Sequence, residues 1–198
     1  MDNLDLFKPS LLLHTQEKMS RYRQGGFHPV NLGDTFKASR YKVYHKLGWG
    51  GSSTVWLARD QSCVALAPHP YHGMLMLYVS PRLQRWVSLK IKTAEGTKPS
   101  RELLVHQKLS KALASPHHLV QLLDSFVHQG PNGNHQCLVF ELLGPTLDAV
   151  VAEYNGAGLR LDDTTVLRIA RQLLQSLAAI HRAGYAHGGL PLSRFPSK

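Results

Sequence analysis

Short apolar runs between turn residues, one of them with apolar and polar residues in alternation, predict β-strands from about residue 41 to residue 141. Residues 41–47 alternate in this way, a glycine cluster follows at 48–51, and a second strand-like run occupies 54–58. Two such runs joined across a short Gly/Ser turn predict a β-hairpin. Further strands are expected at 86–91 and, between prolines, at 73–80.

The apolar runs that follow predict one helix and a second hairpin. Leucines recur over residues 100–113 with polar residues between them, after a Pro-Ser start that is typical of a helix. The runs 119–126 and 136–141 are separated by the Gly/Pro/Asn-rich segment 129–134, so we expect them to pair as strands. Residues 1–38 are mixed and turn-rich, and they are interpreted as an extended lead-in.

The pattern becomes helical from Thr146 onward. The strongest helix is predicted over Asp163–Arg182, where apolar residues recur every three or four positions. Asp162 suits its N-terminus, and Gly184 suits the position just beyond its C-terminus. The apolar stripe is wide enough to require burial on more than one side. Little chain follows to cover it, so we expect an incomplete lobe.

Composition and charge narrow the class of protein. Of the 198 residues, 43% are hydrophobic, which is enough for a buried core. The net charge of +10 suggests either a nucleic-acid or membrane partner, or a basic lobe counted without an acidic remainder. Scattered Lys and Arg residues favour the second interpretation. Two cysteines and no long apolar start predict a soluble protein of the cytoplasm, the nucleus or both.

The glycine cluster is the first candidate for chemistry. Gly48, Gly50, Ser53 and Val55 form the pattern Gly-x-Gly-x-x-Ser-x-Val between two predicted strands. A dinucleotide fingerprint would need a helix after the glycines, whereas a hairpin suits a flap laid over phosphates. Backbone N–H groups can approach phosphate oxygens where no Cβ intervenes. Gly/Ser hairpins are also common without any ligand.

Lys90 is the second candidate. It ends the apolar run Val87–Lys90, where a lysine is costly to desolvate unless it is paired. It is either an edge lysine that faces water or the strand lysine that holds the α- and β-phosphates of a nucleotide. Its partner would be Glu102, early in the predicted helix, with Glu95 as a nearer rival beside a turn glycine.

With these features the chain resembles the SR-protein kinases, and most closely their fungal relatives. The resemblance is carried by Tyr22–Val30, Gly33–Phe36, Arg40–Tyr41, Lys46–Gly50 and Ser53–Ala58, and it continues to about His187. It implies an α+β fold: a kinase-like N-terminal lobe, with an antiparallel sheet and one regulatory helix, followed by the first helices of an incomplete C-terminal lobe. The implied divisions are the lead-in at 1–38, the N-lobe at 39–143 and a partial C-lobe at 144–198.

The same resemblance implies a site for ATP with its Mg²⁺. Residues 137–144 correspond to the strand and hinge that join the lobes, with Phe140 as the gatekeeper. The backbone of the hinge would bind adenine, and two apolar side chains, Leu47 and Val55, would pack on its faces. The complete set of expected ATP-binding residues is Leu47, Gly48, Gly50, Ser53, Val55, Lys90, Glu102, Glu141 and Leu143.

The catalytic loop departs from the family pattern. The family reads His-Gly-Asp, but this chain reads His187-Gly188-Gly189, so the aspartate that accepts the substrate proton is replaced by Gly189. Arg194 stands where a metal-binding Asn is expected, and no Asp-Phe-Gly follows. We therefore expect no catalytic residue and no metal ligand in this chain, and little activity from it alone.

Residues 63–85 are a second departure, because the family usually joins these two strands with fewer residues. This insert is either a real extension or translated intron, as is the tail after Gly188. Three functions remain open. The chain belongs to a serine/threonine kinase that phosphorylates Ser in Arg-Ser-rich proteins and so regulates mRNA splicing, or it is a pseudokinase that binds ATP or a protein, or, least favoured, it is a basic nucleic-acid binder.

Overall fold

The computed structural model describes residues 17–61, 65–68, 75–78, 85–95, 100–112 and 119–186. The chain divides into two compact units. The first consists of Met1–Ser100 with Leu122–Leu142, and the second consists of Arg101–Gln121 with Leu143–Lys198. Each unit is described by itself.

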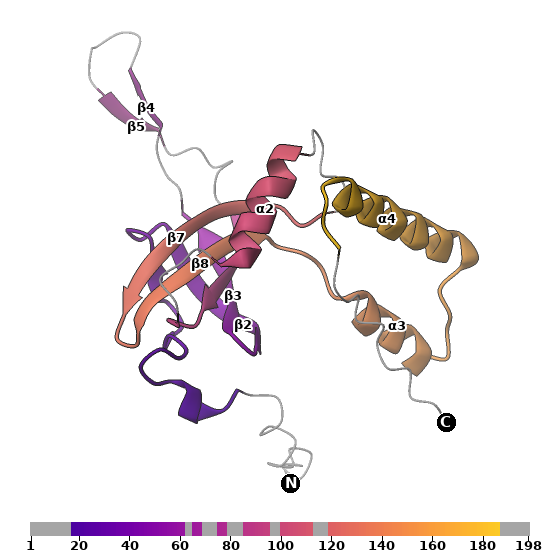
Figure 1. Ribbon diagram of the computed structural model, residues 1–198, viewed down its shortest axis with the longest axis horizontal. Helices are drawn as coiled ribbons and strands as arrows, with labels where there is room; N and C mark the ends of the chain where they lie inside the picture. Colours follow the sequence, from indigo (N-terminus) through magenta and orange to yellow (C-terminus); the bar gives the residue numbers. More distant parts are fainter. Residues whose placement is uncertain are drawn as a thin grey trace. The chain divides into compact units, whose positions relative to one another are not determined.

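A six-stranded antiparallel sheet forms the first unit (Figure 1). Its strand order is β1-β2-β3-β6-β8-β7. The predicted antiparallel sheet is therefore confirmed. The strands are β1 (Thr35–Phe36), β2 (Tyr41–Gly50), β3 (Ser53–Asp60), β6 (Arg85–Lys92), β7 (Leu122–Gly130) and β8 (Gly133–Glu141).

Both predicted hairpins form, but their turns are shorter than expected. Gly48 and Gly50 lie within β2, where they pair with Val55 and Ser53 of β3, so the turn is confined to residues 51–52. Likewise β7 and β8 stay paired up to Gly130 and Gly133, which leaves residues 131–132 as the turn. The prediction assigned every glycine and asparagine near the turns to the turns themselves. Strand pairing uses backbone N–H and C=O groups, so these residues can also belong to the paired strands.

The hydrophobic core lies on one face of this sheet. Val87, Leu89 and Ile91 alternate along β6 and are at most 1% exposed, because successive side chains in a strand point to opposite faces. They belong to one buried cluster with residues from β1, β2, β3 and β8. Its members are Phe36, Tyr41, Val43, Trp56, Ala58, Val87, Leu89, Ile91, Cys137 and Val139.

The segment before β2 also contributes to this unit. Phe27 is fully buried, Phe36 belongs to the buried cluster and Val30 packs against it, so parts of the expected lead-in are buried in this unit. Tyr41 stacks on Phe126 with a ring-centroid distance of 5.8 Å, and its hydroxyl donates to Asp124 at 2.6 Å. These contacts join the start of β2 to β7.

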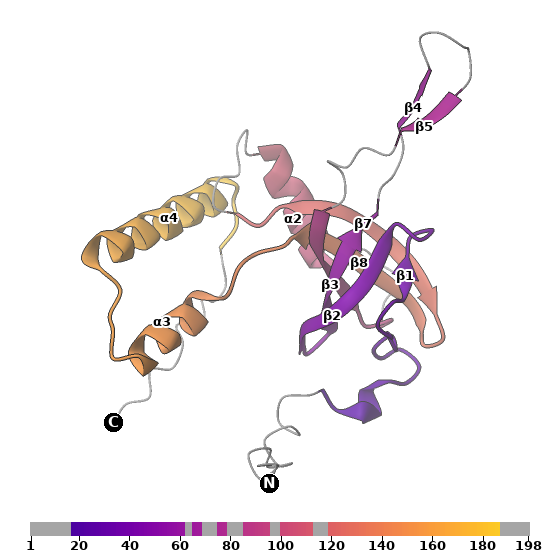
Figure 2. The ribbon, with the colours of Figure 1, turned by 180° about the vertical axis from the view of Figure 1, so that it is seen from behind.

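A small separate hairpin lies between β3 and β6 in sequence. It consists of β4 (Ala65–Pro68) and β5 (Leu75–Tyr78), which form a two-stranded sheet of their own (Figure 2). The sequence predicted a strand within 73–80, where β5 lies, and missed β4. The rest of the insert at 63–85, apart from Arg85, lies outside the described residues.

Three helices belong to the second unit: α2 (Arg101–Ala112), α3 (Leu147–Gly156) and α4 (Asp163–Arg182). The bounds of α4 match the prediction. The carboxylate of Asp162 accepts from the Thr165 backbone N–H at 2.9 Å and caps the helix, and Gly184 adopts a φ of 79° just after it.

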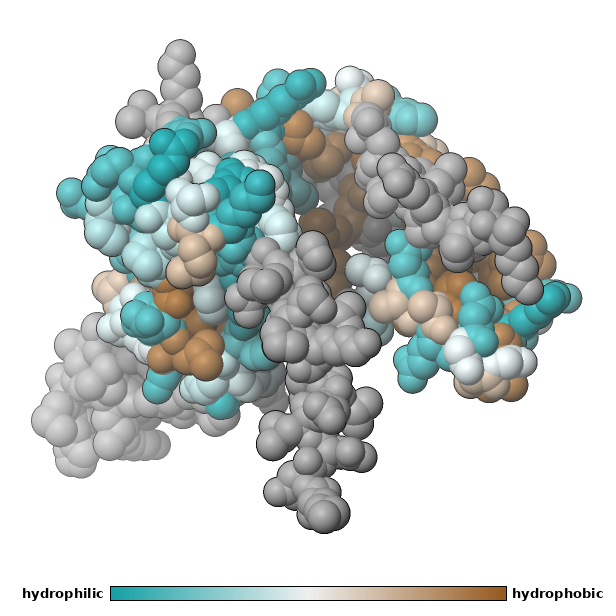
Figure 3. Space-filling model, turned by 90° about the horizontal axis from the view of Figure 1, so that it is seen from below, coloured by the Kyte–Doolittle hydropathy of each residue, from teal (hydrophilic) through white to brown (hydrophobic). Residues whose placement is uncertain are grey.

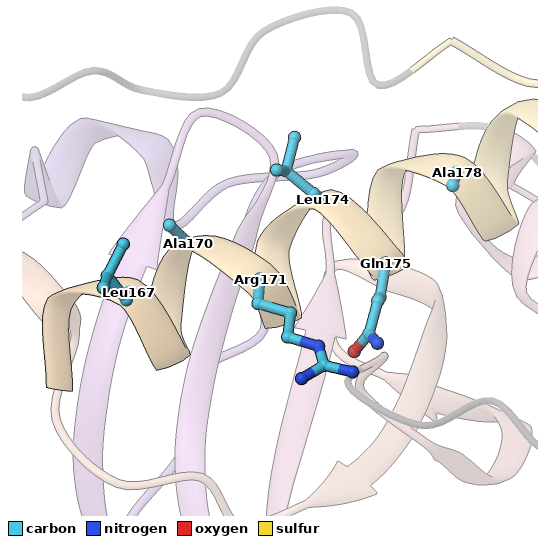
Figure 4. Close-up of a pocket in the computed structure, with 6 residues that line it drawn as sticks. All are labelled: Leu167, Ala170, Arg171, Leu174, Gln175 and Ala178. Atoms are coloured by element: carbon cyan, nitrogen blue, oxygen red, sulfur yellow. The ribbon is translucent and has the colours of Figure 1, made fainter. Parts of the chain in front are cut away.

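The apolar stripe of α4 is exposed in this structure. Leu167 and Leu174 are 69% and 67% exposed, and Ser176 is the only buried residue of the helix. Leu167, Ala170 and Leu174 project from one side of α4, while Arg171 and Gln175 extend from another (Figure 4). Figure 3 shows hydrophobic residues reaching the surface among hydrophilic ones. Within the described residues, no helix combines the length and apolar character needed to cross a membrane.

Candidate nucleotide-binding site

Strand register brings three of the predicted ATP-binding residues into one row. Gly48 of β2 lies opposite Val55 of β3, and Val55 in turn lies opposite Lys90 of β6. The row continues to Leu138 of β8. Directly opposed residues in antiparallel strands have side chains on the same face, so Val55 and Lys90 are neighbours although 35 positions separate them in the sequence.

This row lies on the face of the sheet opposite the core. The adjacent row, Trp56, Leu89 and Val139, is fully part of the buried cluster. Alternation then points Val55 and Lys90 away from that cluster. Both are half-buried. Strand β6 is therefore apolar on its core face and carries Lys90 on its other face. The sequence alone did not show on which face of the strand Lys90 lies.

The glycines of the hairpin leave open space beside the backbone. A Cβ placed on Gly48, Gly50 or Gly51 would meet no atom within 4 Å, and none of the three has a positive φ. Neither internal crowding nor backbone conformation therefore requires glycine here. The open backbone fits the close approach of a phosphate group, for which glycine is the least obstructive residue.

Hydrogen bonds and burial fix the hairpin turn and the residues that follow it. Ser52 accepts a hydrogen bond through its carbonyl from the Thr93 N–H at 2.9 Å, next to the end of β6. Ser53 is 6% exposed and Thr54 is fully buried, and Thr54 accepts from the Trp56 indole at 3.0 Å. Leu47 lies at a register shift between Lys46 and Gly48, and it is 46% exposed.

The expected hinge residues follow the end of β8. Phe140 pairs with Ser88, two positions before Lys90 on the same face of β6, and it is 8% exposed. Glu141 pairs with Val87 as the last residue of β8, and the next residues leave the sheet. Leu143 is 61% exposed and belongs to the second unit.

Glu102 is in the first turn of α2, where a carboxylate is favoured by the helix dipole. It belongs to the second unit, so its ion pair with Lys90 stays a prediction. The rival Glu95 lies beside Gly25, because a Cβ on Gly25 would be 3.3 Å from the Glu95 Cγ. The sequence positions 187–189 and Arg194 lie outside the described residues. Among the residues that are described, no group of His, Cys, Asp or Glu side chains is arranged to hold a metal ion.

Two groups of contacts in the first unit were missed by the sequence analysis. His28, His128 and His135 gather with ring-centroid distances of 4.7 and 4.9 Å from His28 to the other two. Burial, followed by the two neighbouring histidines, lowers the pKa of His28 to about 4. In addition, Arg21 donates to the carbonyl of Gly51 at the hairpin tip. His28 lies 100 or more positions from the other two histidines in the sequence, so no local pattern could have revealed their cluster.

An antiparallel sheet with a glycine-containing hairpin and a lysine on the strand next to that hairpin is typical of the N-terminal lobe of a protein kinase. Comparisons with known proteins specify the family. No protein-family model matches the chain. The chain is 37% identical over 183 residues to protein kinase dsk1 of Schizosaccharomyces pombe. The match covers 88% of this chain and 29% of dsk1.

Two further relatives agree. Serine/threonine-protein kinase SKY1 of Saccharomyces cerevisiae is 34% identical over 173 residues, 84% of this chain and 21% of its own length. Serine/threonine-protein kinase SRPK of Physarum polycephalum is 36% identical over 184 residues, 91% of this chain and 37% of its own length. The chain belongs to the SR-protein-kinase-like family. It spans well under half the length of each of these relatives.

Proposed function

We propose that this chain binds ATP, together with Mg²⁺, on the face of the sheet that carries Lys90. The observation that carries the proposal is the row from Gly48 through Val55 to Lys90 on the face opposite the core. Its support from sequence is the relation to protein kinases, for which a glycine loop and a strand lysine hold the nucleotide phosphates.

Each residue in the proposed site has a distinct role. The backbone of Gly48 and Gly50 faces the phosphates, Lys90 neutralises their charge, and Val55 packs on the base. Leu47 would pack on the opposite side of the base, and Ser53 stands at the third glycine position. The backbone of Glu141 and Leu143 would bind the adenine edge, and Glu102 would pair with Lys90.

For the protein in its longer form, we propose the activity of its family: phosphorylation of Ser in Arg-Ser-rich proteins, in the cytoplasm or nucleus, with a role in mRNA splicing. The support is the homology to serine/threonine kinases of the SR-protein type. The chain covers only part of those proteins, so the substrate-binding surface is not argued from its residues.

For the chain itself, one sequence position favours a second function. Gly189 stands where the family has the aspartate that accepts the proton of the substrate hydroxyl. Loss of a positioned base lowers a rate by roughly 10²–10⁴-fold. We therefore propose that this chain binds ATP, or a protein partner, without efficient phosphoryl transfer.

Thermal shift measurements with Mg-ATP test nucleotide binding. The unmodified chain should unfold at a higher temperature with Mg-ATP, and Lys90→Ala should remove that shift because the phosphate charge loses its partner. Lys42→Ala is the matched control, since Lys42 lies at the end of β2 away from the glycines. A shift that is absent, or that persists in Lys90→Ala, would contradict the proposed site.

Phosphoryl transfer is tested separately, with radiolabelled ATP and an Arg-Ser peptide. The chain should incorporate no label above the level of Lys90→Ala. Incorporation that depends on Lys90 would show that Gly189 is compatible with transfer, and it would exclude the pseudokinase alternative.

A further inference from the structure

A segment that precedes the sheet reaches the proposed phosphate-binding hairpin. We refer to residues 17–27 as the N-terminal segment. The carboxylate of Glu17 accepts hydrogen bonds from the Tyr22 hydroxyl and from Lys46 of β2. Burial raises the pKa of Glu17, but these hydrogen bonds outweigh it, so the net pKa lies below the ordinary value and the group is ionised. One end of the segment is thus tied to the strand that carries the glycines.

The other end of the segment is tied to the opposite side of the unit. Gly25 donates through its N–H to the Asn132 carbonyl at 2.9 Å, and the Asn132 side chain donates to the Phe27 carbonyl at 2.6 Å. Ala94, just after β6, donates to the Gly26 carbonyl at 3.1 Å. The segment is therefore a fixed bridge between the β7–β8 turn and β2, and not a loose end.

A tight turn places Arg21 within this bridge. The Phe27 N–H donates to the Arg21 carbonyl at 2.9 Å, and a Cβ on Gly26 would lie 1.9 Å from that same oxygen. Gly25 has a φ of 76°, which also favours glycine. The Arg21 guanidinium lies 4.5 Å from the centre of the Phe27 ring. The two glycines thus permit the turn that positions the Arg21 backbone, and the Phe27 ring contacts the Arg21 guanidinium.

From this position Arg21 donates through Nη2 to the carbonyl of Gly51, the first residue of the hairpin turn. In a planar trans peptide unit the C=O and the following N–H point in opposite directions. Holding the Gly51 oxygen therefore also fixes the direction of the Ser52 N–H. The Ser52 carbonyl is held as well, by Thr93, so both peptide units that contain Ser52 are anchored.

We propose that Arg21 is a positioning residue that presents the Ser52 N–H to a nucleotide phosphate by holding the Gly51 carbonyl. The proposal rests on the proposed ATP binding. It assigns a ligand-positioning task to a residue outside the glycine loop, the strand lysine and the hinge. A charged donor to a carbonyl makes a stronger bond than a neutral one, which suits an exposed turn of glycine and serine.

Titration calorimetry with two ligands tests the proposal. Arg21→Met keeps an aliphatic side chain on Phe27 but removes the donor, so it should bind Mg-ATP about tenfold more weakly, the effect of losing one charge-assisted hydrogen bond. Its affinity for adenosine, which has no phosphate, should stay within about twofold. Arg21→Lys retains a charged donor and should bind Mg-ATP with intermediate affinity. Arg23→Met, an exposed arginine two residues away, should match the unmodified chain for both ligands.

Two results would overturn the proposal: unchanged Mg-ATP affinity in Arg21→Met, or an equal loss for Mg-ATP and adenosine, which would indicate a general structural role. Thermal unfolding without ligand shows whether each variant is folded. If Arg21→Met does not fold, Arg21→Gln, which shortens the side chain and removes its charge, takes its place, and an ATP affinity equal to that of the unmodified chain would then refute the role. Failure of the unmodified chain to bind either ligand would instead refute the proposed function.

Discussion

The two compact units bury their apolar residues to very different extents. Ten core residues of the first unit form one cluster, and Leu89 at its centre is fully buried. In the second unit α4 carries an equally regular apolar pattern, yet Leu167 and Leu174 are more than 65% exposed. The core side chains of the sheet, including Phe36 and Tyr41, pack against one another within the same unit. An amphipathic helix can bury its stripe only against another surface, so a strong pattern does not by itself make a core.

The contrast can be measured because the two units carry different spectroscopic signals. All three tryptophans, Trp49, Trp56 and Trp86, belong to the first unit. Tryptophan fluorescence therefore follows the unfolding of the sheet. The described helices α2, α3 and α4 all belong to the second unit, so circular dichroism at 222 nm mainly follows that unit.

A matched pair of leucine substitutions should give the largest difference. Leu89→Ala leaves a cavity in a fully buried site and should cost about 3 kcal/mol of unfolding free energy, whereas Leu174→Ala on the exposed stripe should cost less than about 0.5 kcal/mol. Urea unfolding followed by tryptophan fluorescence measures the first, and circular dichroism the second. Similar losses for the two would mean that α4 is covered in solution, and the contrast between the units would fail.

Substitution of a buried and an exposed aspartate should show the same difference between the two units, with a smaller loss of stability. The Asp60 carboxylate is 2% exposed and accepts from Arg40 at 2.9 and 3.0 Å. Asp60→Asn removes the charge from this bidentate pair and should cost about 2 kcal/mol. Asp148→Asn, exposed in the first turn of α3, is the control and should be nearly neutral. An equally small effect at Asp60 in fluorescence-detected unfolding would contradict the expectation.

Acid should destabilise the first unit selectively. The pKa of His28 falls from an ordinary 6.5 to about 4, chiefly through burial, and that of His128 shifts in the same direction. The unfolded chain therefore binds more protons between these pH values, and stability is lost as pH falls from 6.5 towards 4. We expect a loss of about 1–2 kcal/mol between pH 7 and pH 5.

Substitution of the histidine separates this effect from general acid sensitivity. In His28→Gln the dependence of fluorescence-detected stability on pH should become shallower, while His45→Gln, an exposed residue of β2, should leave it unchanged. The charge of Asp34 raises the pKa of His28 and so opposes the lowering caused by burial. Asp34 is therefore left unchanged in both variants. An unaltered slope in His28→Gln would show that other groups carry the pH dependence.

The smallest effect is expected at the start of α4. Hydrogen bonds from Thr164 and Thr165 lower the pKa of Asp162, which keeps this cap ionised. Asp162→Ala removes the cap and should reduce the signal at 222 nm slightly, with no change in the unfolding followed by tryptophan fluorescence. Asp163→Ala, at the next position, should have less effect because the cap remains. A change in the fluorescence transition would mean that the two units unfold together.

The fold was predictable where a pattern is local. The bounds of α4 followed from its spacing and its cap, and β6 followed from the alternation of Val87, Leu89 and Ile91. The turns were predicted too long because glycine is compatible with both a turn and a paired strand. Which of the two forms depends on the pairing with the opposite strand, and the local sequence does not show this pairing. β4 was missed because the apolar run that contains it is short and lies beside prolines.

The candidate site was predictable as a set of residue types but not as an arrangement. Gly48 and Lys90 follow from motifs, whereas their common row depends on two strand registers that the sequence does not display. Arg21 was missed for a different reason. Its role depends on the direction of one peptide unit, and no residue pattern encodes that direction.

One pairing, Asp60 with Arg85, closes the ladder between β3 and β6. Between these two residues in the sequence, the described strands β4 and β5 pair only with each other and not with the six-stranded sheet. Because the cost of closing a loop rises only slowly with its length, this connection can lengthen or shorten with little change in the register beside it. The chain thus has a permissive position, suited to the insertion of a tag or a reporter domain and tolerant of natural variation in length.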